Sequence, residues 1–301
     1  MRRSLKLFLF GVAVPGALSP VIYAAMSSED GPDRERHRVR VETAVVVDVV
    51  TDALADVRVE VGHVASASGC AVGEERTLTV DAGIGDLLNV DAGSGELSVE
   101  GVEGLESVRV TATLCAADDG LFRGLDVSLR RSGSQVELDT DYPSSGGWSD
   151  GYARIDLVVE VPRGMAADID DSSGSMEITG VGALTIDDSS GDIEVVGASG
   201  PVRIDDSSGG IRIQDVSGDV DIEDGSGEID VRDVRGSVVL SDGSGSIDVG
   251  DVTGEVRIRE DGSGSIGVVG VGGDFVVERD GSGGIRHSRV NGRVDIPDGK
   301  R

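Results

Sequence analysis

Lysine is almost absent from this 301-residue chain, which contains only Lys6 and Lys300. Lysine and arginine together number 27, against 56 aspartates and glutamates, and the formal net charge is −29. Such a surface repels the phosphates of nucleic acids and the head groups of anionic lipids, so we expect neither as a partner. It favours cations, cationic peptides and basic patches on other proteins, and it also keeps a protein soluble.

Histidine is equally scarce, and its three residues, His37, His63 and His287, are scattered along the chain. The sequence has no Gly-x-Ser-x-Gly elbow, no phosphate-binding loop and no zinc-ligand spacing. Acidic residues are so frequent that proximity in the sequence cannot single out a glycosidase pair. We therefore predict no catalytic residues and no cofactor, in a protein that is not an enzyme.

Long hydrophobic runs are also missing, because no uninterrupted apolar stretch reaches the length of about 18 residues that a membrane-spanning helix needs. Residues 1–24 instead have the parts of a secretory signal. Arg2, Arg3 and Lys6 precede an apolar run at 7–14, and Ala24 occupies the expected cleavage point. We predict an exported protein of the periplasm, the cell envelope or the extracellular space. Cleavage of the signal and its retention as an anchor both stay open.

The chain has only two cysteines, Cys70 and Cys115. In an exported protein two thiols most simply pair with each other, so we predict a structural disulfide. Two cysteines with no histidine beside them make a poor metal site.

Glycine, by contrast, is abundant and periodic, with 46 residues in the chain. The phrase Asp-x-Ser-Gly occurs seven times at steps of 17, 18, 18, 18, 19 and 19 residues, and a second glycine series runs in phase with it. A repeat this short cannot bury a core alone and must stack on its neighbours. The glycines that end the phrase are Gly174, Gly191, Gly209, Gly227, Gly245, Gly264 and Gly283.

Apolar residues follow each glycine of the phrase at offsets of two, four and seven, and they alternate with polar residues. A period of two with Ile and Val dominant indicates strands with one buried face. Two strands and two corners in each repeat predict an all-β fold, a parallel β-solenoid (β-helix) with about 18 residues per rung. His287 replaces an apolar residue in the last rung, where we expect it to cap the stack.

The repeat also defines the expected organisation of the chain. We predict a flexible lead-in at 25–40, a less regular β portion at 41–165, the solenoid array at 166–297 and a tail at 298–301. The less regular portion contains a polar loop at 141–151 with the single tryptophan, Trp148. The repeat pattern already appears once after Gly95, before an interruption at about 111–165, so we expect one continuous unit.

The aspartate of each Asp-x-Ser-Gly phrase has two interpretations. Asp and Gly are preferred at the two ends of a type I β-turn, where the carboxylate accepts backbone N–H groups. Alternatively, carboxylates stacked about 5 Å apart along one edge would repel one another and bind Ca²⁺. The nine-residue calcium-roll motif is absent, so we commit to no metal site. The residues of the alternative calcium ladder are Asp188, Asp206, Asp224, Asp242 and Asp261.

The alternating strand that ends in Val161-Pro162-Arg163-Gly164, followed by repeated Ser-Gly-x-Ile-x-Val units, resembles a bacterial family. The chain is similar over about residues 75–297 to the DUF4097-type adhesins, β-strand-repeat proteins of the cell envelope. The resemblance implies a repetitive β fold and an envelope or surface location, and it supplies no catalytic residues.

These observations predict an exported, non-enzymatic protein of the cell envelope or surface that acts in adhesion or in protein or glycan binding. The partner would be an envelope or surface protein or glycan, and a cationic one suits the charge. Two alternatives stay open. Parallel β-helices often carry enzymes that act on polysaccharides, and an acidic envelope-stress protein could capture cationic peptides. The outward arginines that an acidic-sugar enzyme would use are interleaved with acids: Arg203, Arg212, Arg232, Arg257 and Arg259.

Overall fold

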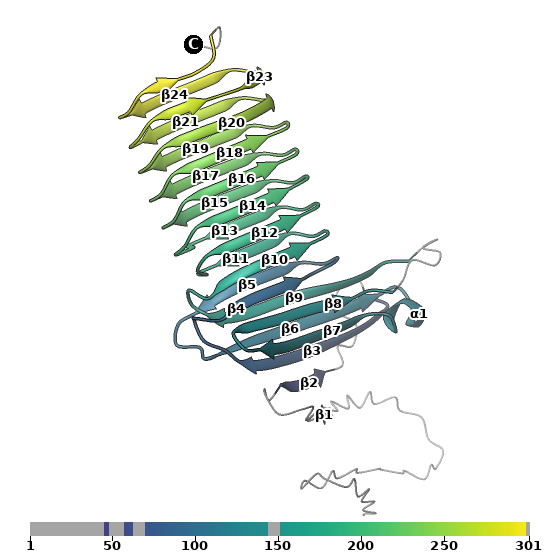
Figure 1. The fold of residues 1–301 in the computed structure, drawn as a ribbon. Helices are drawn as coiled ribbons and strands as arrows, with labels where there is room; N and C mark the ends of the chain where they lie inside the picture. The colour runs from purple at the N-terminus through teal and green to yellow at the C-terminus, as the bar shows by residue number, and fades with distance from the viewer. Residues whose placement is uncertain (1–44, 48–56, 63–69, 144–150, 299–301) are drawn as a thin grey trace, which may run out of the picture. The chain divides into compact units, whose positions relative to one another are not determined.

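The computed structural model describes residues 45–47, 57–62, 70–143 and 151–298 (Figure 1). The predicted signal, the lead-in, His37, His63 and Trp148 lie outside these residues. Strands make up almost all of the regular structure, and the one helix in the described part of the chain is the short α1 (Asp119–Phe122). No helix there is long and apolar enough to cross a bilayer.

The described strands form two sheets that face each other. In spatial order, sheet A consists of β1 (Val45–Val47), β2 (Arg58–Gly62), β3 (Val72–Asp81), β6 (Ser107–Ala116), β9 (Ala153–Pro162), β5 (Leu97–Val102), β11 (Met176–Thr179), β13 (Ile193–Val196), β15 (Ile211–Val216), β17 (Ile229–Val234), β19 (Ile247–Val252), β21 (Ile266–Val271) and β24 (Ile285–Val290).

Sheet B supplies the other strand of each rung. In spatial order it consists of β25 (Val294–Asp295), β22 (Phe275–Val277), β20 (Val256–Ser263), β18 (Val238–Asp242), β16 (Val220–Asp224), β14 (Val202–Asp206), β12 (Leu184–Asp188), β10 (Ala166–Asp171), β4 (Leu87–Asp91), β8 (Gln135–Asp141) and β7 (Asp126–Ser132), with β23 (Asp280–Ser282) paired to β20.

Each repeat forms one rung of a parallel β-solenoid, which confirms the predicted fold class. The chain runs along a strand of sheet B, turns at Asp-x-Ser-Gly, returns along a strand of sheet A and turns again at the second glycine. From β10 to β24, strands of successive rungs pair in parallel, and Figure 1 shows them following one another in sequence order. Leu184, for example, pairs with Val202, and Val202 pairs with Val220. Successive strands in such a stack lie about 4.8 Å apart.

The core lies between the two sheets and is built from the apolar offsets of the repeat. Ile193, Ile211, Ile229 and Ile247 stack in consecutive rungs and are at most 1% exposed. Full burial of such a side chain stabilises the fold by about 1.5–3 kcal/mol, and the same contribution recurs in every rung.

The corner after Asp-x-Ser requires glycine for a steric reason. Gly245 has a φ of 153°, and a Cβ atom placed there would lie 1.5 Å from the carbonyl oxygen of Gly227 in the rung below. The same close approach recurs at Gly209 and Gly264. A side chain at any of these corners would force neighbouring rungs apart.

The stack begins before residue 166. The strands β4 and β5 pair in parallel with β10 and β11, and Leu97 and Val99 align with Met176 and Ile178. The early repeat at Gly95 therefore forms a complete rung of the solenoid.

The interrupting segment widens the same two sheets. On the far side of the β4–β5 rung, β8 pairs in parallel with β4, and β9 pairs in parallel with β5. β7 and β6 then continue the sheets with antiparallel pairing. The β8–β9 rung thus precedes β4–β5 in space although it follows that rung in the sequence. Cys70 and Cys115, in adjoining parts of this widened portion, form a disulfide.

Candidate functional site

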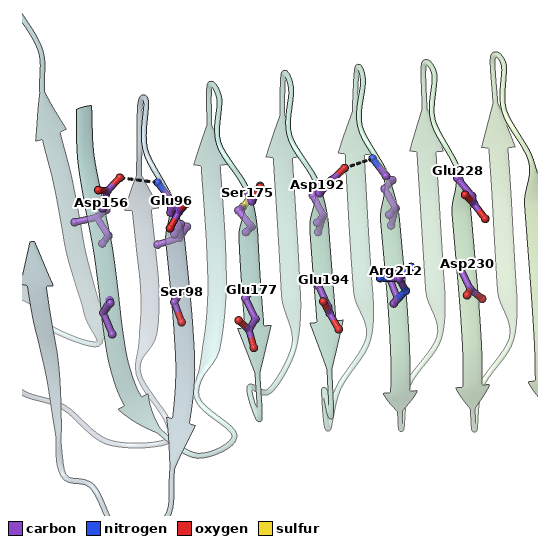
Figure 2. A pocket seen from close by; sticks show the side chains of 17 residues that line it. Glu96, Ser98, Asp156, Ser175, Glu177, Asp192, Glu194, Arg212, Glu228 and Asp230 are labelled. Atoms are coloured by element: carbon purple, nitrogen blue, oxygen red, sulfur yellow. Dashed lines mark hydrogen bonds between the residues drawn. The ribbon is translucent and has the colours of Figure 1, made fainter. Parts of the chain in front are cut away.

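A shallow groove of about 660 Å³ crosses the outer face of sheet A, over β9, β5, β11, β13, β15 and β17 (Figure 2). Its walls are outward-facing side chains that successive rungs place side by side. Some of the outward positions along the groove carry small residues, which leave hollows between the longer side chains of neighbouring rungs. These small residues are Ser98, Ser175 and Gly210. The groove therefore arises because outward positions of the repeat are not constrained to one side-chain size.

The groove is strongly acidic. Seven carboxylates and one cation, Arg212, line it, and no histidine, cysteine or lysine does so. Figure 2 shows the acidic side chains along the faces of the strands, on both sides of Arg212. The seven acids are Glu96, Asp156, Glu177, Asp192, Glu194, Glu228 and Asp230.

Three of these acids are engaged within the protein. Asp156 accepts the backbone N–H of Glu96 at 3.1 Å and pairs with Arg154 at 3.0 Å. Asp192 accepts the N–H of Gly210 at 2.9 Å, and Asp230 lies 2.9 Å from a guanidinium nitrogen of Arg232.

The other four acids, Glu96, Glu177, Glu194 and Glu228, form no ion pair with the described residues through their side chains. All four are exposed. Val158, half exposed at 50%, adds an apolar contact surface at the β9 end of the groove. The groove thus offers uncompensated negative charge beside a small apolar patch.

A second, smaller hollow of about 320 Å³ lies nearer the C-terminal rungs. It is lined by Arg232, Arg286 and His287 together with Asp248 and the partly exposed Val269. The centroid of the His287 ring lies 5.8 Å from that of Phe275, a fully buried side chain near the C-terminal end of the core, and the two rings are tilted relative to each other. His287 therefore covers the end of the apolar stack, although its own side chain is exposed.

The aspartates of the Asp-x-Ser-Gly phrase lie inside the fold, on the same face of their strands as the apolar core residues. We call Asp171, Asp188, Asp206, Asp224 and Asp242 the aspartate column; they are between 2% and 7% exposed, and Asp261 continues the series. The physical reason is the pleat: Asp188 follows Leu184 and Ile186 at a period of two, so it shares their inward face. The same alternation, extended from Ile186 to Asp188, predicts that the aspartate side chain is buried.

One oxygen of each column carboxyl group makes the expected turn contact. Oδ1 of Asp188, Asp206, Asp224 and Asp242 accepts the backbone N–H of the serine two residues later, at 3.0–3.2 Å. The second oxygen, Oδ2, has no hydrogen-bond donor at any of the five column residues. Among the described residues, no group of three or more His, Cys, Asp or Glu side chains is arranged to hold a metal ion.

Burial changes the acidity of the column. Desolvation, opposed by the backbone N–H groups and reinforced by neighbouring aspartates, raises the pKa of Asp171 to about 7. The same causes raise the pKa values of Asp188, Asp224 and Asp242 to about 6, and burial also raises the pKa of Asp206. Burial therefore favours the protonated, neutral form of the column carboxyl groups.

The outward arginines singled out in the sequence do not gather into one basic site. On sheet B, Arg203 and Arg259 both pair with Asp221, at 3.1 and 3.2 Å, and Arg257 pairs with Glu278 at 2.8 Å. Arg212 and Arg232 lie on sheet A. These arginines are interleaved with acids, as the sequence indicated.

The fold and these surfaces define a class of protein: an all-β parallel solenoid whose rungs share a dry core and whose outer face carries an acidic groove. The family model described as Toastrack DUF4097 matches residues 74–270, about two thirds of the chain. The chain belongs to the Toastrack DUF4097 family.

Two solved structures show weak similarity. One, provisionally named as a cell adhesion protein from Clostridium sporogenes, is 14% identical, with a TM-score of 0.27 and coverage of 74% of this chain and 98% of its own. The other, provisionally named as a lipid binding protein from Parabacteroides distasonis, is 16% identical, with a TM-score of 0.40 and coverage of 74% and 97%. No curated protein matches the chain.

Proposed function

We propose that this protein is an exported, non-enzymatic component of the cell envelope or surface, and that it binds a basic, extended segment of a partner protein in the acidic groove of sheet A. Export rests on the signal-like N-terminus. A surface β-repeat role accords with membership of the Toastrack DUF4097 family. The observation that carries the binding proposal is the groove, with seven carboxylates against one arginine.

The groove's geometry favours a chain-like ligand over a compact one. It extends across six strands, and successive strands lie about 4.8 Å apart, so its acids recur along the stack. A basic segment laid across the rungs could place several cationic side chains near Glu177, Glu194 and Glu228. Single exposed ion pairs contribute only about 0.2–1 kcal/mol, so binding requires several together and weakens with salt.

The lining residues favour binding over catalysis. Histidine, cysteine, lysine and tyrosine are absent from the groove lining, which leaves no activated nucleophile beside a base. The paired arginines of sheet B likewise supply no cluster of free cations for an acidic sugar. When a panel of polysaccharides is incubated with this protein, we expect no new reducing ends and no unsaturated products.

The proposal is tested with a fluorescent peptide rich in arginine and lysine, titrated against the full chain at low and high salt. We expect binding that weakens with salt and falls about tenfold or more in the variant Glu177→Gln/Glu194→Gln/Glu228→Gln, which loses about three ion pairs. The matched control, Asp187→Asn/Asp205→Asn/Glu223→Gln, removes the same charge from the outer face of sheet B. Equal losses in both variants would show that net charge, and not the groove, attracts the peptide.

A further inference from the structure

The aspartate column places acidic side chains where the fold elsewhere places Ile and Val. Its members are paired in register on adjacent strands of sheet B: Asp171 with Asp188, and so on through Asp206 and Asp224 to Asp242. Neighbouring strands are about 4.8 Å apart. A continuous row of ionised, buried carboxylates at this spacing would be strongly unfavourable, because both desolvation and mutual repulsion oppose the charge.

The surroundings of the column supply no cation. The charged groups that act on it are other carboxylates, either column neighbours or the outward aspartates of the same strands, Asp170, Asp187 and Asp205. The corners that follow contribute backbone N–H groups to the carboxyl oxygens. At the β8 end, the charge of Asp171 contributes to the raised pKa of the Tyr142 hydroxyl group. No arginine, lysine or histidine forms an ion pair with a column residue in the described part of the chain.

The two oxygens of each column carboxyl group have different roles. Oδ1 accepts a backbone N–H of the corner, while Oδ2 is buried and has no donor. A buried acceptor without a donor is costly, and a carboxyl group becomes a donor itself when it is protonated. The residue paired in register with each member carries a second buried carboxyl group.

We propose that the aspartate column is a proton-binding ladder, in which a protonated carboxyl group on one rung donates its O–H to the carboxylate of the next rung. Each proton is taken from water as the rungs form and returns to water when they separate. The O–H stays on its donor and the neighbouring carboxylate accepts the hydrogen bond, so no other reactant is needed. The solenoid is consequently an acid-stabilised structure that loosens as its protons leave.

The direction of the pH effect follows from the acidities of the column. Unfolded aspartate has a pKa near 3.8, whereas the folded values are about 6 for Asp188 and Asp224 and about 7 for Asp171. The folded chain therefore binds more protons than the unfolded chain between these values, and its stability falls as pH rises through them. The contribution is complete below the unfolded pKa and is lost above about pH 7.

Thermal unfolding of the full chain tests the ladder at constant ionic strength. Asparagine keeps the turn acceptor and adds an amide donor that needs no proton. We expect Asp188→Asn/Asp206→Asn to melt higher than the wild type at about pH 8. At about pH 5, between the unfolded and folded pKa values, this variant should release up to about two fewer protons on unfolding. The matched control, Asp187→Asn/Asp205→Asn, removes the same charge from exposed positions of the same strands. Because burial is the largest cause of the raised pKa values and these outward residues only add repulsion, the control should keep most of the wild-type pH dependence. Equal behaviour of the two variants would overturn the proposal, because the effect would then be one of net charge.

Infrared spectroscopy of the folded protein provides a second measurement that does not depend on unfolding. The wild type and the outward variant, Asp187→Asn/Asp205→Asn, should show the C=O band of protonated carboxyl groups at neutral pH. The inward variant, Asp188→Asn/Asp206→Asn, should show less of this band. Absence of that band in the wild type would overturn the ladder. Stabilisation of the wild type, but not of the inward variant, by millimolar calcium at pH 8 would also overturn it, in favour of a metal site.

Discussion

The hydroxyl group of Tyr142 both accepts a hydrogen bond from the backbone N–H of Ser94, at 2.8 Å, and donates one to the carbonyl oxygen of Ser94, at 2.7 Å. The tyrosine follows β8, whereas Ser94 lies in the corner between β4 and β5, 48 positions earlier in the sequence. One side chain thus joins the β8–β9 rung to the β4–β5 rung at their corner.

Replacement of Tyr142 by Phe should therefore weaken the widened end of the solenoid. The ring would remain packed against the core, but the backbone N–H of Ser94 would lose this acceptor, at a cost of about 1–3 kcal/mol. Chemical denaturation of the two proteins measures the difference. Unchanged stability would mean that water replaces the hydroxyl without loss.

Substitution of Gly245 by Ala should be severely destabilising. The added Cβ would lie 1.5 Å from the carbonyl oxygen of Gly227, and the φ of 153° suits only glycine. We expect a loss of more than about 2 kcal/mol in the free energy of unfolding. Gly85→Ala is the matched control, since a Cβ there meets nothing within 4 Å, and its stability should change by less than about 0.5 kcal/mol.

Removal of the disulfide should destabilise the widened portion. Cys70 and Cys115 are 45 positions apart, and opening such a loop typically costs about 2–4 kcal/mol. The double variant Cys70→Ser/Cys115→Ser should unfold at lower denaturant concentration, and reductant should lower the stability of the wild type but not of the variant. A count of two free thiols in the unreduced, denatured protein would contradict the pairing.

Neutralisation of the groove's single cation should strengthen binding of a basic peptide. Arg212 lies among seven acids, and its replacement by Gln removes the one repulsive charge. We expect the dissociation constant to fall by about two- to fivefold, which corresponds to roughly 0.5–1 kcal/mol. Arg203→Gln changes the net charge equally on sheet B and should leave the affinity nearly unchanged; an equal gain there would contradict a local effect.

Much of the fold could be predicted because its information is local. The alternation around Ile186 defines an inward face, and the glycines at fixed intervals define corners, so the rung follows from short stretches of sequence. The stacking of rungs then follows from the constant period. The burial of Asp188 was missed because acidic residues are ordinarily exposed, although the same alternation places it inward.

The candidate groove could not be predicted in the same way. Asp156 and Glu96 are 60 positions apart, and they meet because β9 pairs with β5 after a long antiparallel excursion. No local sequence pattern predicts which strand pairs with the outer edge of the first rung and so extends the sheet. The hollow also depends on the small size of Ser175 and Gly210 in rows where neighbouring rungs carry longer side chains.

The amino-acid sequence by itself determined the rung, its corners and the apolar residues of its interior, since each depends on residues a few positions apart and on the two-residue pleat. Tertiary pairing decided that a later segment precedes an earlier one in the stack, that acids from distant strands share one groove, and that buried carboxyl groups face one another. These relationships arise when strands far apart in the chain satisfy each other's backbone hydrogen bonds, and only the assembled sheets specify those pairs.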